Sequence, residues 1–385
     1  MRIALLTIHR APNCGAMLQA WALMRALQQM GHEVEFPDCN HIDYRDRTKP
    51  FLPDPTLPPL KRLHRALKNG LRNWKARKIF LPTMERFAGF VRQHMTESPL
   101  APSAFGSRYD AVIVGSDQLW NEGIMGDDTD LFLGTTVSPG LKVISYGTSF
   151  GDNPPTGTAA ERVLRAMPRF AAIGVRESSG ADFLKDSGFE AKVTSDPTLL
   201  LTPADYLTVA SPVHPTERYV YAYSVFFDTR LLELTREVAR RRGLRYVYTP
   251  LSQYTSYGMP KDIEYGVTPD RFVDLIAHAE CVLTDSFHGT ALSLIFGKPL
   301  VSFCRAAVMA HSRQGELLRA SGCLDRQMRL DASPDAVLEL PAKPLPPEVG
   351  ERIDAVRAEG RQWLAEQLTL RPHGEANADE SASCT

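Results

Sequence analysis

One histidine and three arginines are the side chains of this sequence best suited to chemistry. Arg176 follows the apolar run FAAIGV, and His288 lies in the segment TDSFHGT. Arg305 and Arg313 flank the loop that follows another apolar run, PLVSFC. An arginine is always charged and can hold a phosphate or carboxylate through two hydrogen bonds, whereas a histidine can bind a phosphate oxygen or transfer a proton near neutral pH. Together these residues predict a site for a small substrate with two or three negative charges.

His288 lies between a predicted strand and a predicted helix. The apolar residues Val282 and Leu283 lead into the polar segment TDS, and a helical pattern runs from about 289 to 296. In an open parallel sheet, ligands bind beyond the carboxyl ends of the strands, where the N–H groups of the next helix favour an anion. We expect His288 at that place. The structural alternatives are that His288 caps the helix or fills a hydrogen-bonded turn, and that each arginine forms a surface ion pair.

Polar residues follow other predicted strands as well. Residues 109–114 lead into Ser116 and Asp117, and the strand at 2–8 leads into the turn HRAPNCGA. In that turn, Asn13 and Gly15 suit a close approach of the backbone to a ligand, although Gly15 could instead only provide a positive φ angle. Because the carboxyl ends of parallel strands meet at one edge of a sheet, these residues predict the first-domain wall of a cleft.

Apolar strands alternate with amphipathic helices, which predicts an α/β protein with two Rossmann-like domains that face each other across a cleft. A chain of 385 residues exceeds one ordinary core. We place the first domain at 1–205 and the second at 206–345, because a Pro-rich segment occupies 201–218. Residues 346–370 predict a last helix that could cross back to the first domain, and we expect 371–385 to be disordered.

An insert at about 41–107 interrupts this alternation. Within it, residues 61–78 contain eight Lys and Arg residues and no acid. Apolar residues recur there at helical spacing, namely Leu60, Leu63, Leu67, Leu71 and Trp74. We expect this helix to dock on the body through its apolar stripe and to leave its basic face in solvent. The alternatives are that it rests on an anionic membrane or holds an anionic acceptor, which would make the insert the acceptor side.

Composition and missing motifs argue against several classes of protein. The formal net charge of −1 disfavours a general nucleic-acid binder. Six cysteines without a CxxC pair indicate reduced thiols, and we expect neither a signal peptide nor a membrane span, hence a cytoplasmic protein. The sequence contains no P-loop, HExxH, GxSxG or kinase signature. We expect no metal and no cofactor, because arginines and helix N-termini can balance an anion.

Several segments, in this order and spacing, resemble the polysaccharide pyruvyl transferase family. They are NCGAMLQAWAL (13–23), VIVGSDQLWN (112–121), ISYGTSFG (144–151), VRESSG (175–180), SDPTLLL (195–201) and VLTDSFHGTALSLIFGKPLV (282–301). Cys14 and Trp21 stand where the family often has other residues. The resemblance implies a fold similar to the GT-B glycosyltransferases, with a donor-side second domain and phosphoenolpyruvate as the donor.

The resemblance also implies roles for individual residues. The arginine of the VRE block is Arg176 and the histidine of the SFHG block is His288, and both positions are linked to donor binding and catalysis in the family. The later arginine of the family falls on Arg305 or Arg313. We assign His288 as the acid, base or phosphate contact and Asp117 as a group that activates an acceptor hydroxyl. Donor binding extends to Ser286, Gly289 and Thr290, and the cleft or acceptor side comprises Asn13, Gly15, Ser116 and Asp117.

The implied reaction sets pyruvate as a cyclic ketal on two hydroxyls of a sugar, in a bacterial glycan or its lipid-linked precursor, and releases phosphate. The expected partners are phosphoenolpyruvate and that glycan, with peripheral contact at the inner face of an anionic membrane as an option and no nucleic acid. One alternative is a GT-B glycosyltransferase that uses a nucleotide sugar. The second alternative is a non-catalytic protein that binds a glycan or phosphoenolpyruvate.

Overall fold

The computed structural model describes residues 1–37, 58–151, 153–211, 217–225, 228–251, 263–304 and 312–369. Arg305, residues 41–57 of the insert and the predicted tail at 371–385 lie outside these ranges.

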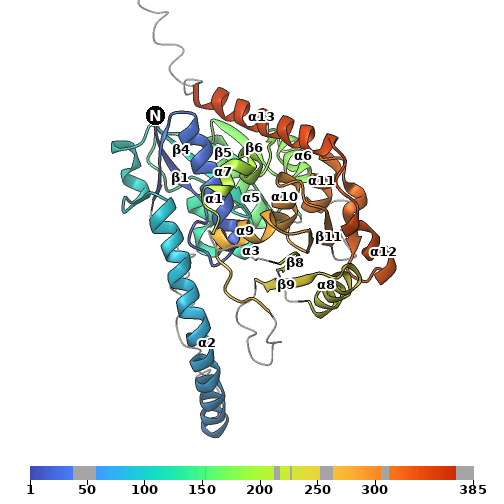
Figure 1. Ribbon diagram of the computed structural model, residues 1–385. Helices are drawn as coiled ribbons and strands as arrows, with labels where there is room; N and C mark the ends of the chain where they lie inside the picture. Colours follow the sequence, from blue (N-terminus) through green and yellow to red (C-terminus); the bar gives the residue numbers. More distant parts are fainter. Residues whose placement is uncertain are drawn as a thin grey trace, which may run out of the picture.

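Seven parallel strands of the described chain form the first sheet, in the order β3-β2-β1-β4-β5-β6-β7. Figure 1 labels β1, β4, β5 and β6 of this sheet. They are β1 (Arg2–Leu6), β2 (Glu33–Pro37), β3 (Glu97–Ser98), β4 (Ala111–Asp117), β5 (Lys142–Thr148), β6 (Ala172–Val175) and β7 (Lys192–Val193). Strand β1 pairs with β2 on one side and with β4 on the other. The strand order therefore reverses at β1 and β4, and in doubly wound sheets ligands bind at the carboxyl ends of such a pair.

The second sheet has five parallel strands, in the order β12-β11-β10-β8-β9. They are β8 (Tyr219–Ser224), β9 (Arg245–Pro250), β10 (Cys281–Thr284), β11 (Leu300–Cys304) and β12 (Gln327–Arg329). Here the order reverses at β8 and β10, which pair directly. The predicted pair of Rossmann-like domains is confirmed.

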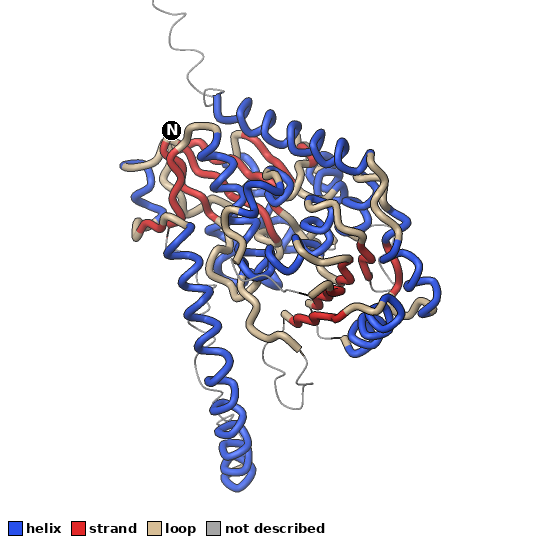
Figure 2. The backbone as a smooth tube through the Cα atoms, in the orientation of Figure 1, coloured by secondary structure: helices blue, strands red, loops and turns tan. Residues whose placement is uncertain are grey.

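Helices cover both sheets, as the tube in Figure 2 shows. Those before β8 are α1 (Cys14–Gln29), α2 (Pro59–His94), α3 (Glu122–Met125), α4 (Thr129–Phe132), α5 (Gly157–Ala166), α6 (Ser178–Asp186) and α7 (Pro203–Leu207). Those after β8 are α8 (Thr229–Arg242), α9 (Pro269–Ala277), α10 (Phe287–Ile295), α11 (Arg313–Ala320), α12 (Pro334–Glu339) and α13 (Glu348–Thr369).

Helix α1 joins the two domains. Almost all of its residues are buried, and Leu18 and Trp21 belong to the same hydrophobic cluster as Phe272 of α9 and Leu292 of α10. A helix that is apolar on all sides must be covered on all sides. The first sheet covers one side of α1 and the second domain covers the other, so the N-terminus of α1 lies at the boundary between the domains.

Helix α13 follows the second sheet in the chain and packs against the first domain (Figure 1). Lys192 Nζ of β7 lies 2.7 Å from a carboxylate oxygen of Glu359, and Arg357 Nε donates to the Leu201 carbonyl at 3.0 Å. A Cβ added at Gly360 would lie 2.5 Å from the hydroxyl of Tyr146, so only glycine lets α13 approach β5 this closely.

Helix α2 extends away from the body, and its packed part lies near its C-terminal end (Figure 1). Phe87 and Phe90 lie in the core, whereas Leu60, Leu63 and Leu67 are 83%, 60% and 69% exposed. The prediction that the apolar stripe docks on the body is therefore wrong for these three leucines, because the helix carries them past the folded domains. In the described part of the chain, every helix is too short or too polar to cross a bilayer.

Candidate active site

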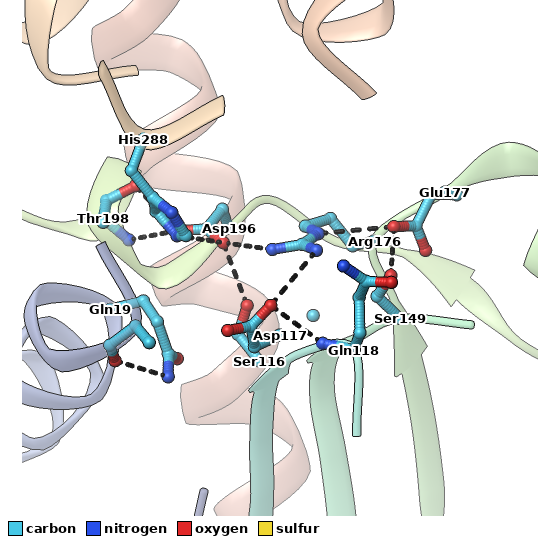
Figure 3. A network of polar contacts seen from close by, with 12 residues as sticks. Gln19, Ser116, Asp117, Gln118, Ser149, Arg176, Glu177, Asp196, Thr198 and His288 are labelled. Atoms are coloured by element: carbon cyan, nitrogen blue, oxygen red, sulfur yellow. Dashed lines mark hydrogen bonds and ion pairs between the residues drawn. The ribbon is translucent and has the colours of Figure 1, made fainter. Parts of the chain in front are cut away.

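Asp196 lies at the centre of a buried polar network (Figure 3). It follows β7, and its carboxylate accepts hydrogen bonds from Ser116 Oγ at 2.9 Å, Arg176 Nη1 at 2.8 Å and Thr198 Oγ1 at 2.7 Å. His288 Nε2 lies 3.7 Å from Asp196 Oδ2. One carboxylate thus connects three segments of the first domain with the histidine of the second.

The surroundings of Asp196 keep its carboxylate charged. The side chain is fully buried, which by itself favours the neutral acid, but His288 and the guanidinium of Arg176 hold the pKa of Asp196 well below its usual range. A buried charge is tolerated only when it is paired and hydrogen-bonded, so the three groups depend on one another. Asp196 therefore holds Arg176 and His288 in place.

Arg176 lies directly after β6 and is almost completely buried. Its Nε lies 3.4 Å from Glu177 Oε1, and its guanidinium carbon lies 5.0 Å from the centre of the Phe287 ring. Burial opposes its charge, but Glu177, Asp196 and Asp117 together raise the pKa of Arg176 above its usual value. Its Nη2 is buried and has no hydrogen-bond partner among the described residues, since Asp117 Oδ1 is 3.9 Å away. This N–H group can bind a ligand.

His288 is the second residue of α10 and is 9% exposed. The residue that caps the helix is Ser286, whose Oγ accepts a hydrogen bond from the Gly289 N–H at 3.3 Å. The alternative that His288 is the cap is therefore wrong. Its Nε2 is buried and has no hydrogen-bond partner within the described ranges. A buried nitrogen without a partner is unusual and indicates a group held ready for a ligand.

Gly15 lies in the first turn of α1, directly against His288. A Cβ added at this position would lie 2.2 Å from Nδ1 of His288. Asn13 caps the same helix, because its Oδ1 accepts hydrogen bonds from the N–H groups of Gly15 at 3.0 Å and Ala16 at 3.3 Å. Gly15 is not among the positive-φ residues, so the explanation by a positive φ angle is wrong. The glycine is needed because the histidine of the other domain occupies the space of a side chain.

The end of β4 contributes Ser116 and Asp117. Ser116 is fully buried and donates to Asp196. Asp117 has a φ of 81°, and no other non-glycine residue of the described chain has a positive φ. Its Oδ1 accepts a hydrogen bond from the Gln118 N–H at 2.9 Å. Such a backbone conformation costs about 1–3 kcal/mol and persists where the surrounding structure enforces it, which often happens at functional sites.

Gly289 and the side chain of Thr290 face the second sheet rather than the network. Thr290 Oγ1 lies 2.8 Å from Ser302 Oγ of β11, and both are fully buried. A Cβ added at Gly289 would lie 2.5 Å from Thr284 Oγ1, so this glycine lets α10 lie close to β10. Both residues support the position of His288 by packing α10 on its sheet.

Arg313 is the first residue of α11. Together with Arg176, Asp196 and Phe287 it lines a cavity of about 200 Å³ at the edge of the network. The structure therefore places Arg313 on the same cavity as Arg176, while Arg305 lies outside the described residues.

Several polar residues of the network were not predicted from the sequence, among them Asp196, Glu177 and Gln19. Burial raises the pKa of Glu177, although Arg176 and a hydrogen bond from Ser149 Oγ oppose this rise. One oxygen of Glu177 and the Oε1 of Gln19 are buried with no partner in the described chain. Asp196 had a usable signal, because it follows a strand and precedes a proline within the block SDPTLLL.

The network suits anion binding. Within the described ranges, no group of three or more His, Cys, Asp and Glu side chains is arranged to hold a metal ion. Arg176 and His288 each present one buried nitrogen that has no hydrogen-bond partner in the described chain. An anion can accept hydrogen bonds from both, and a histidine beside it can also transfer a proton.

A family model described as polysaccharide pyruvyl transferase matches residues 13–303. None of the curated proteins matches the chain. The chain is similar to the MnaA structure from S. aureus with UDP (12% identity, 96% of this chain and 98% of that chain, TM-score 0.49). It is also similar to UDP-GlcNAc 2-epimerase from Neisseria meningitidis bound to UDP-GlcNAc. The identity is 11%, the match covers 96% of this chain and 99% of that chain, and the TM-score is 0.49. A third similar structure is spinosyn rhamnosyltransferase SpnG with thymidine diphosphate. The identity is 14%, the match covers 96% of this chain and 100% of that chain, and the TM-score is 0.44.

Proposed function

Because the chain belongs to the polysaccharide pyruvyl transferase family, we propose that it transfers pyruvate from phosphoenolpyruvate to a sugar as a cyclic ketal. The acceptor is a sugar of a bacterial glycan or of its lipid-linked precursor, and the by-product is phosphate. The protein works in the cytoplasm, in peripheral contact with the inner face of the membrane. It uses no metal and no cofactor besides the donor.

The observation that carries this proposal is the pair of buried nitrogens, Arg176 Nη2 and His288 Nε2, that face carboxylates at ion-pair distance but have no hydrogen-bond partner in the described chain. Both side chains are anchored on Asp196, one at 2.8 Å and the other at 3.7 Å. Phosphoenolpyruvate has a phosphate ester and a carboxylate attached to the same carbon, C2. Two anchored donors from different domains suit a small substrate with two anionic groups.

In the proposed reaction, two hydroxyl oxygens of the sugar add in turn to C2 of phosphoenolpyruvate. A proton adds to the methylene carbon C3 and leaves positive charge at C2, which a sugar hydroxyl attacks as it loses its proton. The C2–O bond to phosphate then breaks, and phosphate leaves with the electron pair of that bond. The neighbouring hydroxyl attacks C2 and loses its proton, which completes the ketal. The site must therefore hold two anionic groups, supply one proton and accept two.

We assign these tasks to the residues of the network. Arg176 and a later arginine, Arg313 or Arg305, hold the carboxylate and phosphate of the donor. His288 donates the proton to C3 or hydrogen-bonds the departing phosphate. Asp117, at the end of β4, accepts the proton of an acceptor hydroxyl.

The direct test is an incubation of the purified protein with phosphoenolpyruvate and a panel of glycans and lipid-linked sugars. We expect release of inorganic phosphate together with a mass gain equal to pyruvic acid minus one water on the acceptor. Turnover of nucleotide sugars instead, with release of nucleoside diphosphate, would replace the proposal with the glycosyltransferase alternative. Stabilisation by phosphoenolpyruvate without turnover of any acceptor would favour the binding-protein alternative.

His288→Ala tests the assignment of the histidine. We expect phosphate release to fall by about 100-fold or more, because general acid–base groups contribute roughly 10²–10⁴-fold. His32→Ala, in the turn before β2, is the matched control and should keep wild-type turnover. If His288→Ala turns over at the wild-type rate, the assignment of His288 is wrong even if the activity is right.

A further inference from the structure

The exposed end of α2 has an apolar stripe that the folded domains do not cover. Leu60, Leu63 and Leu67 are 83%, 60% and 69% exposed. Their spacing places them on one face of the helix, and Leu71 and Trp74 continue the same spacing in the sequence. The other large apolar residues that are exposed in the described chain, such as Ile124 and Leu324, belong to different elements. Among the described elements, only α2 combines several exposed large apolar residues in one row, and such a patch marks an interaction surface.

The same part of α2 is strongly basic. Residues 60–78 contain eight Lys and Arg residues and no Asp or Glu, although the whole chain has a formal net charge of −1. Positive charge is therefore concentrated on the element that carries the uncovered leucines. A basic helix with a row of leucines and a tryptophan has the composition of helices that lie on anionic bilayers.

The packed end of α2 is connected to the active site. Arg86 Nη2 donates to the Gly266 carbonyl of the second domain at 2.9 Å, and the next carbonyl, of Val267, accepts a hydrogen bond from Cys14 Sγ at 3.2 Å. Cys14 precedes Gly15, which lies against His288. Helix α2 thus begins its outward course beside the segments that position His288. Figure 1 shows α2 extending away from the body.

We propose that residues 59–81 of α2 bind the surface of an anionic lipid bilayer, with the leucines among the acyl chains and the basic residues at the headgroups. This inference deepens the proposed function, because a lipid-linked acceptor lies in the same surface. A second copy of the chain is disfavoured as the occupant, since pairing two such helices would bring two basic segments together. A nucleic acid would engage the basic residues and leave the leucines exposed.

Vesicle sedimentation tests this inference without any turnover. We expect the wild-type protein to sediment with vesicles that contain phosphatidylglycerol, to remain in solution with pure phosphatidylcholine vesicles, and to be released by salt. Leu63→Glu combined with Leu67→Glu should weaken binding by about tenfold or more, because both changes place charge on the apolar stripe. The matched control, Ile124→Glu combined with Leu324→Glu, adds the same charge on other exposed positions and should bind like the wild type.

Three outcomes would overturn the inference. The first is equal sedimentation of the wild-type protein with both vesicle types. The second is a loss of vesicle binding in the control variant as large as that in the leucine variant. The third is self-association of the wild-type protein, measured by light scattering, that the leucine changes abolish. Turnover of a water-soluble acceptor should be unchanged in the α2 variant. Wild-type protein that turns over a water-soluble acceptor but does not bind anionic vesicles would refute this inference alone, and wild-type protein that binds the vesicles without any turnover would refute the proposed function alone.

Discussion

Gly15 of the first domain and His288 of the second lie so close that a Cβ on Gly15 would come within 2.2 Å of the His288 ring. The contact is made by the first turns of two helices, α1 and α10, that belong to different sheets. The position of the histidine therefore depends on the packing between the domains as well as on its own helix. Asp196 completes this arrangement, because its carboxylate lies between Arg176 and His288.

Gly15→Ala tests this contact. The added methyl group must displace the His288 ring or separate the domains locally, and a shift of about 1 Å in a catalytic group can cost on the order of 100-fold in rate. We expect turnover to fall by that order. Gly350→Ala is the control, because a Cβ at Gly350 meets nothing within 4 Å, and it should keep full activity. Wild-type turnover in Gly15→Ala would show that the ring can move without consequence.

Asp196→Asn tests the central carboxylate. The change keeps the shape of the side chain but leaves the buried charge of Arg176 with one partner fewer, and breaking a buried ion pair costs about 3–5 kcal/mol. We expect a clear loss of unfolding free energy in denaturant melts and a weaker thermal shift with phosphoenolpyruvate. Ser116→Ala, which removes one hydrogen bond to the same carboxylate, should cost only about 1 kcal/mol. Equal stability of Asp196→Asn and the wild type would contradict the role of Asp196.

The strand ends that carry polar residues could be predicted from the sequence, because a doubly wound sheet collects its ligand groups at that edge. We selected Arg176, His288 and Asp117 in this way, and the structure places Arg176 and His288 beside Asp196 and places Asp117 beside Arg176. Asp196 itself was missed. Its importance arises from contacts between segments that are far apart in the chain, and these contacts depend on how the two domains pack.

The apolar stripe of α2 shows a different limit. Periodicity predicts that a helix has an apolar face, but it does not say what covers that face. Leu60 and Leu67 have the spacing of apolar residues that pack a helix against a core, and yet both are exposed. Gly15 is a similar example, because a glycine needed for a close contact and a glycine needed for a positive φ angle look the same in a sequence.

Asp117 provides a prediction that separates backbone strain from chemistry. Its φ of 81° is easy for glycine and costs roughly 1–2 kcal/mol for alanine. Asp117→Gly should therefore unfold at a higher temperature than Asp117→Ala, and both should lose turnover if the carboxylate activates the acceptor. Calorimetry and phosphate release measure the two effects separately. The same melting temperature for the two variants would argue against a strained backbone, and full turnover in both would remove Asp117 from the mechanism.

The lowered pKa of Glu97, in β3, leads us to expect that the stability of the fold depends on pH. Burial alone would raise its pKa, but hydrogen bonds from His9 Nε2 at 3.0 Å and Arg10 Nε at 2.7 Å lower the pKa of Glu97 to about 2, from 4.5. Because the folded-state pKa is the lower one, this carboxylate stabilises the fold above about pH 4.5, and the contribution is lost as the pH falls towards 2. We expect the loss to be on the order of 2 kcal/mol, since the side chain is still partly exposed.

Denaturant melts between pH 6 and pH 3 measure this loss. The unfolding free energy of Glu97→Gln should therefore decline less steeply towards acid pH than that of the wild type. The control Glu161→Gln, at an exposed position, should leave the decline unchanged. Parallel declines for Glu97→Gln and the wild type would show that the pairing with His9 and Arg10 does not contribute to folding.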